Sequence, residues 1–386
     1  MKTPLSWLQL SHEKSRLLIA LAGIGFADML MFIQLGFKAA LFDSSVTFHK
    51  ALRGDIFLMS PQSDALGFTK TFSERRLYES LAVEQVESVV PIYLNFGSWK
   101  NPVKQNNKTT TRTILTIAFN PAKNSLNFPG VAENIDQLKL PDVYLFDDKS
   151  RAEFGPIPDL VKQNGTVKTE VDSRQISVRG LFSMGASFAA DGNILTSDTN
   201  FLRLFSERKK GLIDVGIINL KPGADLASVK ATLKSKLPQD VDVFDKEEFM
   251  QKEISYWQNA TAIGFIFTLG TAIGFVVGIV IVYQILYTDV ANHLPEYATL
   301  KAMGYKDSYF VILVFQEAII LAVLGFLPGY LLATGLYSLA AGATALPLSM
   351  TASRATTVLI LTIIMCCASG TVAVKKLSAA DPADIF

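Results

Sequence analysis

Residues 260–287 read ATAIGFIFTLGTAIGFVVGIVIVYQILY, a stretch of 28 residues without a charged side chain. As a helix rising about 1.5 Å per residue, it is longer than the roughly 30 Å hydrocarbon core of a bilayer. Gly270, Gly274 and Gly278 recur at every fourth position and therefore lie along one helix face. In lipid, such a face lets another helix backbone approach closely. The stretch predicts a membrane span, 259–287, that packs tightly against a neighbour.

Three more apolar stretches predict spans at 17–40, 309–333 and 356–375. The long polar segment 41–258 separates the first span from the other three. Gly325 and Gly329 place a second close-packing site near the end of the third span. The predicted fold class is a membrane protein with four transmembrane helices (1+3) and a large mixed α/β domain between helices 1 and 2.

Composition agrees with this division. The chain has 386 residues, a mean hydropathy of +0.30 and only 18% charged residues. Between Asp43 and Gln258 there are 27 basic and 27 acidic side chains, so the polar domain is neutral and offers no basic surface for nucleic acid. The two cysteines of the chain, Cys366 and Cys367, lie in the last apolar stretch, where we expect them to act as small apolar side chains.

The polar domain shows strand–helix–strand patterns near both of its ends, in 41–120 and 213–258. Asp225 is a predicted N-cap for the helix that follows it. Between these parts, 121–212 is rich in Pro, Gly, Asp and Asn and predicts an inserted, more β-rich subdomain. The charged helix expected over 245–260 either continues directly into the second span as a lever or is a simple connection to it.

Basic residues near the span ends predict the orientation. A short amphipathic helix (1–16), a loop (288–308) and a tail (376–386) would share one side, and a short loop (334–355) would lie on the other. The first side holds seven basic residues, and the other short loop holds Arg354 alone. The positive-inside rule therefore places both termini in the cytoplasm and the polar domain outside.

Two carboxyl residues, Asp28 and Glu317, fall inside predicted spans. A charged group at such depth is costly, so both should face the helix bundle or a wet cavity. Two roles are open. The carboxyls lie at similar predicted depth and could share a proton, or each could hydrogen-bond a neighbouring helix.

Motifs for catalysis are missing from the sequence. It contains no G-x-x-x-x-G-K-[ST] loop for nucleotide phosphates, and its three histidines form no H-E-x-x-H pair. No catalytic residue, metal site or cofactor is expected, and the chain is predicted not to be an enzyme. Any energy from ATP would have to come from a partner subunit.

Several segments carry a resemblance to a known family. EYATLKAMGY (296–305) resembles the R-E-[IF]-[AG]-x-[LM]-[KR]-A-[LM]-G segment of the permease family that includes MacB, LolC/LolE and FtsX, although Pro295 stands where many members have Arg. Gln316–Glu317 with Gly325, and Asp381–Asp384, resemble two further family motifs. The DevC-type subgroup of exporters is similar over more of the chain, in segments 26–44, 72–81, 86–93, 98–102 and 145–156.

The resemblance implies a permease that dimerises in the inner membrane and works with a cytoplasmic ABC ATPase of the DevA/MacB type. It implies a membrane-fusion adaptor (DevB-like), a TolC-like outer-membrane channel and a lipid or glycolipid-like cargo. It also implies that the outer domain is periplasmic and porter-like, with the inserted subdomain. The alternative is an FtsX-like adaptor that transports nothing and regulates a cell-wall hydrolase.

The loop 288–308 is the predicted ATPase-coupling segment. A helix starting near Pro295 would place Tyr297, Leu300, Lys301 and Gly304 on one side, as a mixed apolar and cationic face for a groove on the ATPase. The complete set of predicted coupling residues is Glu296, Tyr297, Leu300, Lys301, Gly304 and Tyr305.

Overall fold

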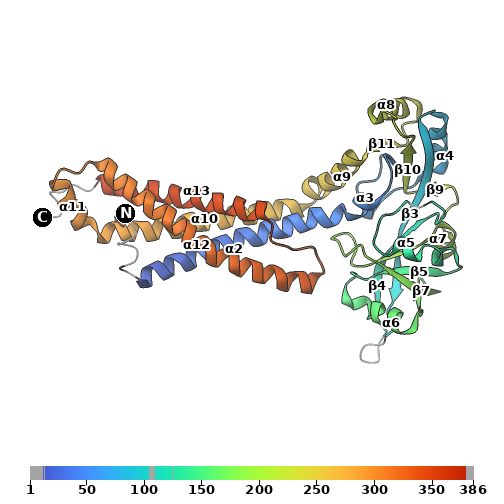
Figure 1. Cartoon of the computed structure of the whole chain (residues 1–386), viewed down its shortest axis with the longest axis horizontal. Coiled ribbons are helices and arrows are strands. Elements are labelled where there is room, and N and C mark those ends of the chain that lie inside the picture. The colour runs from blue at the N-terminus through green and yellow to red at the C-terminus, as the bar shows by residue number, and fades with distance from the viewer. Residues whose placement is uncertain (1–11, 13, 104–108, 124, 380–386) are drawn as a thin grey trace. The chain divides into compact units, whose positions relative to one another are not determined.

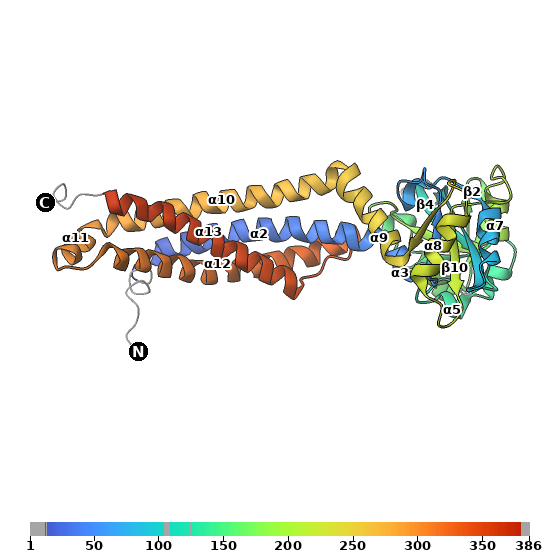
Figure 2. The ribbon, with the colours of Figure 1, turned by 90° about the horizontal axis from the view of Figure 1, so that it is seen from above.

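The computed structural model describes residues 12, 14–103, 109–123 and 125–379. The chain divides into two compact units, one formed by most of the apolar helices and one by residues 41–261 with the short segment 344–347. Four helices are long and apolar enough to cross a membrane, which confirms the predicted fold class. These helices are α2 (Lys14–Ser45), α10 (Ala262–Asn292), α12 (Asp307–Thr344) and α13 (Ala352–Ala379). They run alongside one another in both views of the membrane unit (Figures 1 and 2).

Two of the predicted segments fall outside this description. Most of the expected amphipathic helix 1–16 lies in residues that the structure does not describe. The same holds for the motif at Asp381–Asp384 and for most of the tail 376–386. Both remain predictions.

The third apolar helix is longer than its sequence suggests. We expected it to end at 333, but α12 continues through Thr344 and contains Pro328 within it. The connection to α13 is correspondingly short, because that helix begins at Ala352. The residues after 333 still include Leu336, Tyr337 and Leu339, and such side chains are compatible with a continued helix in lipid.

Strands from the first and last parts of the second unit form a four-stranded antiparallel arrangement of order β11-β1-β10-β3. Numbered along the chain, these strands have the order 4-1-3-2, with a helix after the first strand and another after the third. This is the split β-α-β arrangement. Its elements are β1 (Ile56–Met59), α4 (Glu74–Glu79), β3 (Val86–Lys100), β10 (Val215–Leu220), α8 (Leu226–Lys236) and β11 (Asp242–Asp245). Asp225 caps α8 by accepting a hydrogen bond from the Ser228 N–H, as its sequence position predicts.

The inserted part forms a second sheet that closes on itself. β3 pairs with both β4 and β6, so the order β3-β4-β8-β5-β7-β6 returns to β3. Closure removes the open sheet edges. The strands are β4 (Thr111–Phe119), β5 (Val143–Asp147), β6 (Val167–Val171), β7 (Arg174–Phe182) and β8 (Asn193–Ser197). From the sequence we assigned β4 to the strand–helix–strand part, 41–120, and not to the inserted subdomain. Its partners are β8 and the second half of β3, so it belongs to the inserted sheet.

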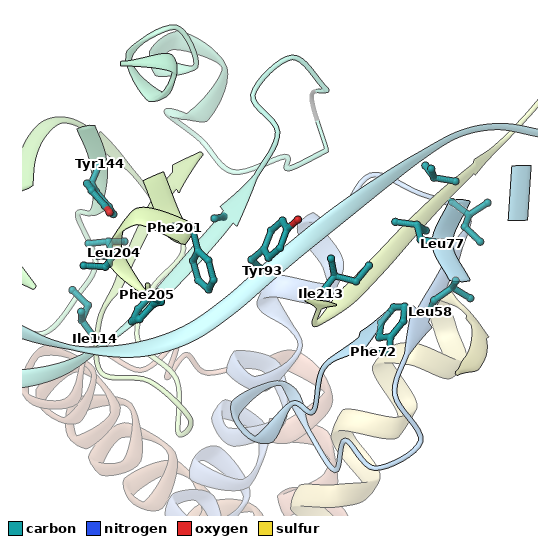
Figure 3. Close-up of a cluster of buried hydrophobic side chains, with 14 of the residues drawn as sticks. Leu58, Phe72, Leu77, Tyr93, Ile114, Tyr144, Phe201, Leu204, Phe205 and Ile213 are labelled. Carbon is teal, nitrogen blue, oxygen red and sulfur yellow. The ribbon is translucent and has the colours of Figure 1, made fainter. Parts of the chain in front are cut away.

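β3 serves both sheets because it is 15 residues long. Its first half pairs with β10 and its second half with β4, and the change of partner occurs at Ile92. Side chains from both sheets meet on one continuous core, in which Tyr93 lies near Phe201 and Leu58 lies near Phe72 and Leu77 (Figure 3). The two parts therefore share a core.

Short elements complete this unit. They are the helices α3 (Thr47–Ala51), α5 (Val131–Asn134), α6 (Ile157–Asn164), α7 (Asp198–Leu204) and α9 (Lys246–Ser255), the strands β2 (Phe72–Ser73) and β9 (Leu212–Ile213), and the single-turn 3₁₀ helices.

α3 and α9 are joined by a buried polar cluster. The His49 ring lies 4.5 Å from the Phe249 ring, and its Nε2 is 3.7 Å from Glu253 Oε2. The Glu253 carboxylate accepts hydrogen bonds from the Leu66 N–H and the Trp257 indole N–H, both at 2.8 Å. Burial raises the pKa of Glu253 to about 6 and lowers the pKa of His49 to about 3. The segments that follow the first span and precede the second are thereby tied to each other.

No continuous lever helix leads into the second span. α9 ends at Ser255, a π-helical turn covers Tyr256–Ala260, and Thr261 is extended with φ −114° and ψ 153°. The Thr261 hydroxyl donates to the Trp257 carbonyl at 2.7 Å, which satisfies an acceptor at the helix end. Of the two arrangements that we left open, the structure has the simple connection.

Candidate functional site

The segment between α10 and α12 forms a short helix with defined ends. α11 (Leu294–Ala302) has Pro295 in its first turn, where the missing N–H costs nothing. At its C-terminus the Tyr305 N–H donates to the Leu300 carbonyl and the Gly304 N–H donates to the Lys301 carbonyl. With Gly304 at φ +97°, this is a Schellman cap, whose left-handed position favours glycine. Part of the predicted coupling set therefore shapes the turn.

Tyr297 lies on the inner side of α11. Its side chain is only 3% exposed, and its ring lies 5.5 Å from that of Phe310 at the start of α12. Leu300 packs partly against the same cluster, which also contains Val290, Leu313, Val314 and Val374. The prediction that Tyr297 belongs to an outward face is therefore wrong. The large apolar side chains of α11 face α10 and α12, because these helices offer it an apolar surface.

The outward side of α11 consists of different residues. Glu296 and Thr299 are exposed, Met303 is 65% exposed and Tyr305 is 46% exposed. We call these four residues the α11 face. Lys301 is half-buried and lies beside this face. The sequence analysis did not include Thr299 and Met303 among the coupling residues. Residues three and four apart lie on one face of a helix, so the spacing of Glu296, Thr299 and Met303 could have indicated this face.

The inner side of this region holds two carboxyl groups. Glu317 on α12 is fully buried, and the Asp289 side chain on α10 lies close to its carboxyl group. Among the described residues, no N–H or O–H group of another side chain or of the backbone donates to either Glu317 oxygen. Asp289 Oδ1 lies 3.7 Å from Nδ1 of His293, which is four residues later and just beyond the end of α10. Two neighbouring carboxyl groups in a buried site can hold a proton between them, so Asp289 and Glu317 form a candidate proton-holding pair.

Asp28 lies elsewhere in the bundle. The Thr362 hydroxyl on α13 donates to Asp28 Oδ1 at 2.7 Å, and a Cβ at Gly329 would lie 2.7 Å from Asp28 Cβ. Gly329 and Glu317 are twelve residues apart on α12, or about 18 Å along the helix. Asp28 and Glu317 therefore do not share a proton. Depth counted from sequence could not show this, because it did not establish which turns of α2 and α12 meet.

The glycine stripe of α10 faces α2. A Cβ at Gly270 would lie 2.5 Å from Gln34 Cδ, and one at Gly274 would lie 3.3 Å from Met31 Cγ. At Gly278 a Cβ would meet Ala27 Cβ at 3.0 Å and would also clash with Met365 of α13. The stripe thus packs within one chain, against the first span and part of the fourth.

The glycines of α12 pack against another side of α2. A Cβ at Gly325 would lie 2.6 Å from Ile24 Cγ2. One at Gly329 would lie 2.9 Å from the Gly25 carbonyl oxygen, so these two backbones nearly touch. α2 is therefore held between the glycine-bearing faces of α10 and α12.

Comparison with known proteins gives one family match. Residues 268–382 match the family described as FtsX-like permease C-terminal. A search of curated proteins found no significant match.

Solved structures with some similarity were also found. The periplasmic region of MacB from Actinobacillus actinomycetemcomitans is 12% identical, with a TM-score of 0.35, over 52% of this chain and 92% of that one. The extracellular domain of the ABC-type transporter YknZ from Gram-positive bacteria is 12% identical, with a TM-score of 0.33, over 50% and 99%. A domain of a permease protein from Porphyromonas gingivalis is 16% identical, with a TM-score of 0.30, over 51% and 89%. Such low scores support no conclusion about this chain.

The family match covers α11, α12, α13 and most of α10, and so includes the α11 face and the Asp289–Glu317 pair. In this region the chain is similar to the C-terminal part of the FtsX-like permeases.

Proposed function

We propose that this chain is the membrane-spanning permease subunit of an ABC-type transporter, and that a separate ATPase drives it through the α11 face. The observation that carries the proposal is the construction of α11. A short capped helix lies between two spans, with Tyr297 anchored on the inside and Met303 presented on the outside. A push on this helix would act on α10 and α12 together.

Two further observations support the proposal. The match to FtsX-like permeases covers the segment in question. The sequence has no phosphate-binding loop of its own, so a transporter of this kind needs a nucleotide-binding partner. On this proposal α11 and both termini are cytoplasmic, since ATP is there and since the basic residues favour that side.

The finer assignment follows from the resemblance of segments such as 26–44 and 145–156 to DevC-type exporters. On that basis the chain works as a homodimer in the inner membrane and exports a lipid or glycolipid-like cargo. Its polar unit would pass the cargo to a membrane-fusion adaptor and a TolC-like channel.

The test is a substitution on the α11 face that leaves the inner, packed side of α11 unchanged. Met303→Asp places a charge at a 65% exposed position, so the fold should persist. Leu300→Asp is less suitable because Leu300 packs into the inner cluster and its carbonyl accepts the cap hydrogen bond. The ATPase gene is co-expressed with the tagged permease, and recovery of the ATPase is measured with its stimulated ATP hydrolysis.

We expect Met303→Asp to lower ATPase recovery at least tenfold and to abolish export. Leu140→Asp is the matched control, because Leu140 is also an apolar side chain, 40% exposed, but belongs to the other unit. Recovery of the ATPase at the wild-type level by Met303→Asp would contradict the role of this face.

A further inference from the structure

The loop after β1 carries an exposed aromatic side chain. Residues Leu66–Phe68 form a single 3₁₀ turn, in which the Phe68 N–H donates to the Ala65 carbonyl at 2.9 Å. Leu66 is buried, but the Phe68 side chain is 54% exposed. Its ring lies 5.8 Å from the ring of Tyr256, which is half-buried. We call Phe68 and Tyr256 the aromatic pair.

Hydrogen bonds fix the turn on both sides of Phe68. Before it, the Leu66 N–H donates to the buried Glu253 carboxylate at 2.8 Å. After it, the Thr69 hydroxyl donates to Asp214 Oδ1 at 3.1 Å. The ring is therefore presented by a fixed turn, and covering it with an apolar medium would remove its surface from water at little further cost in order.

The chain keeps the aromatic pair close to the membrane. Tyr256 is six residues before Ala262, the first residue of α10. Six residues reach about 20 Å even when they are fully extended. The actual separation is shorter, because Tyr256–Ala260 form a helical turn. This limit holds for every arrangement of the two units.

The other connection to the membrane helices reaches the same place. His49 is four residues after Ser45, where α2 ends, and its ring lies 3.7 Å from Glu253. Glu253 is the residue that accepts the hydrogen bond from the Leu66 turn. The turn is thus bonded to the cluster through which the chain enters and leaves the polar unit.

The length of α10 places its start among the lipid headgroups. It has 31 residues, or about 46 Å at 1.5 Å per residue. A bilayer with its headgroup regions is about 40–45 Å thick. Because α10 is as long as the whole bilayer, its first residues lie at the level of the headgroups, and the aromatic pair lies within reach of them.

The side chains suit that region. A phenol and a phenyl ring are typical of residues at the membrane interface. Trp257, which is also close to the span in sequence, is only 6% exposed and donates its indole N–H to Glu253 at 2.8 Å. Asp64 and Lys70 of the loop are exposed and of opposite charge, so the loop does not require anionic lipid.

We propose that Phe68, with Tyr256 beside it, inserts into the headgroup region of the bilayer and anchors the base of the polar unit to the lipid surface. The partner is the bilayer itself, and a zwitterionic phospholipid is sufficient. The anchor limits how far the polar unit can lean away from the membrane. It depends on neither the ATPase nor the cargo.

The test uses a fluorescent label beside Phe68. An environment-sensitive fluorophore is attached at Lys70→Cys in the full chain, with Cys366→Ala and Cys367→Ala to remove the native cysteines. The Lys70 side chain is exposed, so the label leaves the turn intact. The protein is reconstituted in phosphatidylcholine vesicles with and without a phospholipid that carries a quenching nitroxide near its headgroup. The matched control is the label at Lys162→Cys, an exposed lysine on α6 of the same unit.

We expect quenching at Lys70→Cys to be at least three times stronger than at Lys162→Cys. Adding Phe68→Ser to the labelled chain should lower the quenching at position 70 to nearly the control value. Phe68→Leu keeps an apolar side chain and should retain the quenching. Equal thermal unfolding temperatures identify variants that remain folded, and the comparison of the two labels with Phe68 intact does not depend on them.

Three results would overturn the proposal. Equal quenching at Lys70→Cys and Lys162→Cys would mean that the loop does not reach the lipid. Unchanged quenching in the folded Phe68→Ser variant would mean that Phe68 is not the anchor. A label at position 70 that is shielded from water but not quenched would show that protein, such as a second copy of the chain, covers the loop.

Discussion

The Thr362 hydroxyl donates a 2.7 Å hydrogen bond to Asp28 Oδ1, joining the fourth apolar helix to the first over 334 positions of sequence. Both side chains are fully buried. Thr362 also donates to the Val358 carbonyl at 2.8 Å, so its proton is shared between the two acceptors. This contact lies beside Gly329, where the backbones of α2 and α12 nearly touch. One oxygen of the buried Asp28 carboxyl is therefore hydrogen-bonded at a close contact between helices.

The first prediction concerns this hydrogen bond. Asp28→Asn keeps an acceptor oxygen for Thr362, whereas Thr362→Val removes the donor at nearly constant volume. We expect Asp28→Asn to be tolerated and Thr362→Val to lower the stability of the helix bundle by about 1 kcal/mol, as for other interhelical hydrogen bonds in membranes. Thermal unfolding in detergent measures both. A Thr362→Val variant as stable as the wild type would show that this hydrogen bond does not stabilise the bundle.

The second prediction concerns the glycine contact of α12 with α2. Gly329→Ala would place a methyl group 2.9 Å from the Gly25 carbonyl oxygen and 2.7 Å from Asp28 Cβ. Because the first of these is a backbone atom, the helices must move apart, at a cost of about 1–3 kcal/mol. Gly335→Ala on the same helix meets nothing within 4 Å and should be neutral or stabilising. Protease resistance of the folded protein in membranes would distinguish the two, and equal resistance would refute close packing at Gly329.

The third prediction concerns the Asp289–Glu317 pair. Glu317→Gln keeps a hydrogen-bonding group beside Asp289 that cannot ionise, and Glu317→Leu removes the polar group altogether. If the pair only ties α10 to α12, Glu317→Gln should keep transport within about twofold of the wild type, and Glu317→Leu should impair it. We expect this outcome. Loss of transport in Glu317→Gln, with normal recovery of the ATPase, would instead make the proton part of the transport cycle.

The fourth prediction concerns the pH dependence of folding through His49 and Glu253. Burial lowers the pKa of His49 from 6.5 to about 3, so the unfolded chain binds a proton below pH 6.5 that the folded chain lacks. Burial raises the pKa of Glu253 from 4.5 to about 6, so between these values the folded chain holds the extra proton. From about pH 4.5 to 6 the two effects oppose each other. Below pH 4.5 only His49 counts, and its contribution to the free energy of unfolding should fall by about 1.4 kcal/mol per pH unit, down to about pH 3.

The measurement compares His49→Phe with the wild type. The variant cannot take up the proton, and its ring can still pack against Phe249. Thermal unfolding of the full chain, followed by tryptophan fluorescence between pH 3 and 7, should show a flatter acid limb in His49→Phe. His12→Phe, at an exposed position, is the control and should follow the wild type. An unchanged acid limb in His49→Phe would mean that this histidine is protonated in the folded chain.

Local patterns in the sequence were sufficient to place the four membrane helices, though not the end of α12, and to identify two residues at helix starts. A backbone in lipid must satisfy its own hydrogen bonds, so a long uncharged stretch such as 260–287 has few alternatives to a helix. Asp225 before α8 and Pro295 at the start of α11 act within one turn of the chain, and both lie where their positions predict. These features depend on neighbours in sequence, and the sequence alone determined them.

The tertiary structure decided which residues meet. Asp28 accepts a hydrogen bond from Thr362, Glu317 lies close to Asp289, and the Tyr297 ring packs near the Phe310 ring. Such pairings depend on which helices meet and how far one is shifted along another. Helical periodicity can indicate which face of a helix packs, as for the glycines of α10, but not its partner or the level of the contact. The same reason applies in the polar unit, where a strand pattern predicts β3 but not its three partners β10, β4 and β6. Contacts between distant segments result from the packing of the whole core, and only the folded chain shows them.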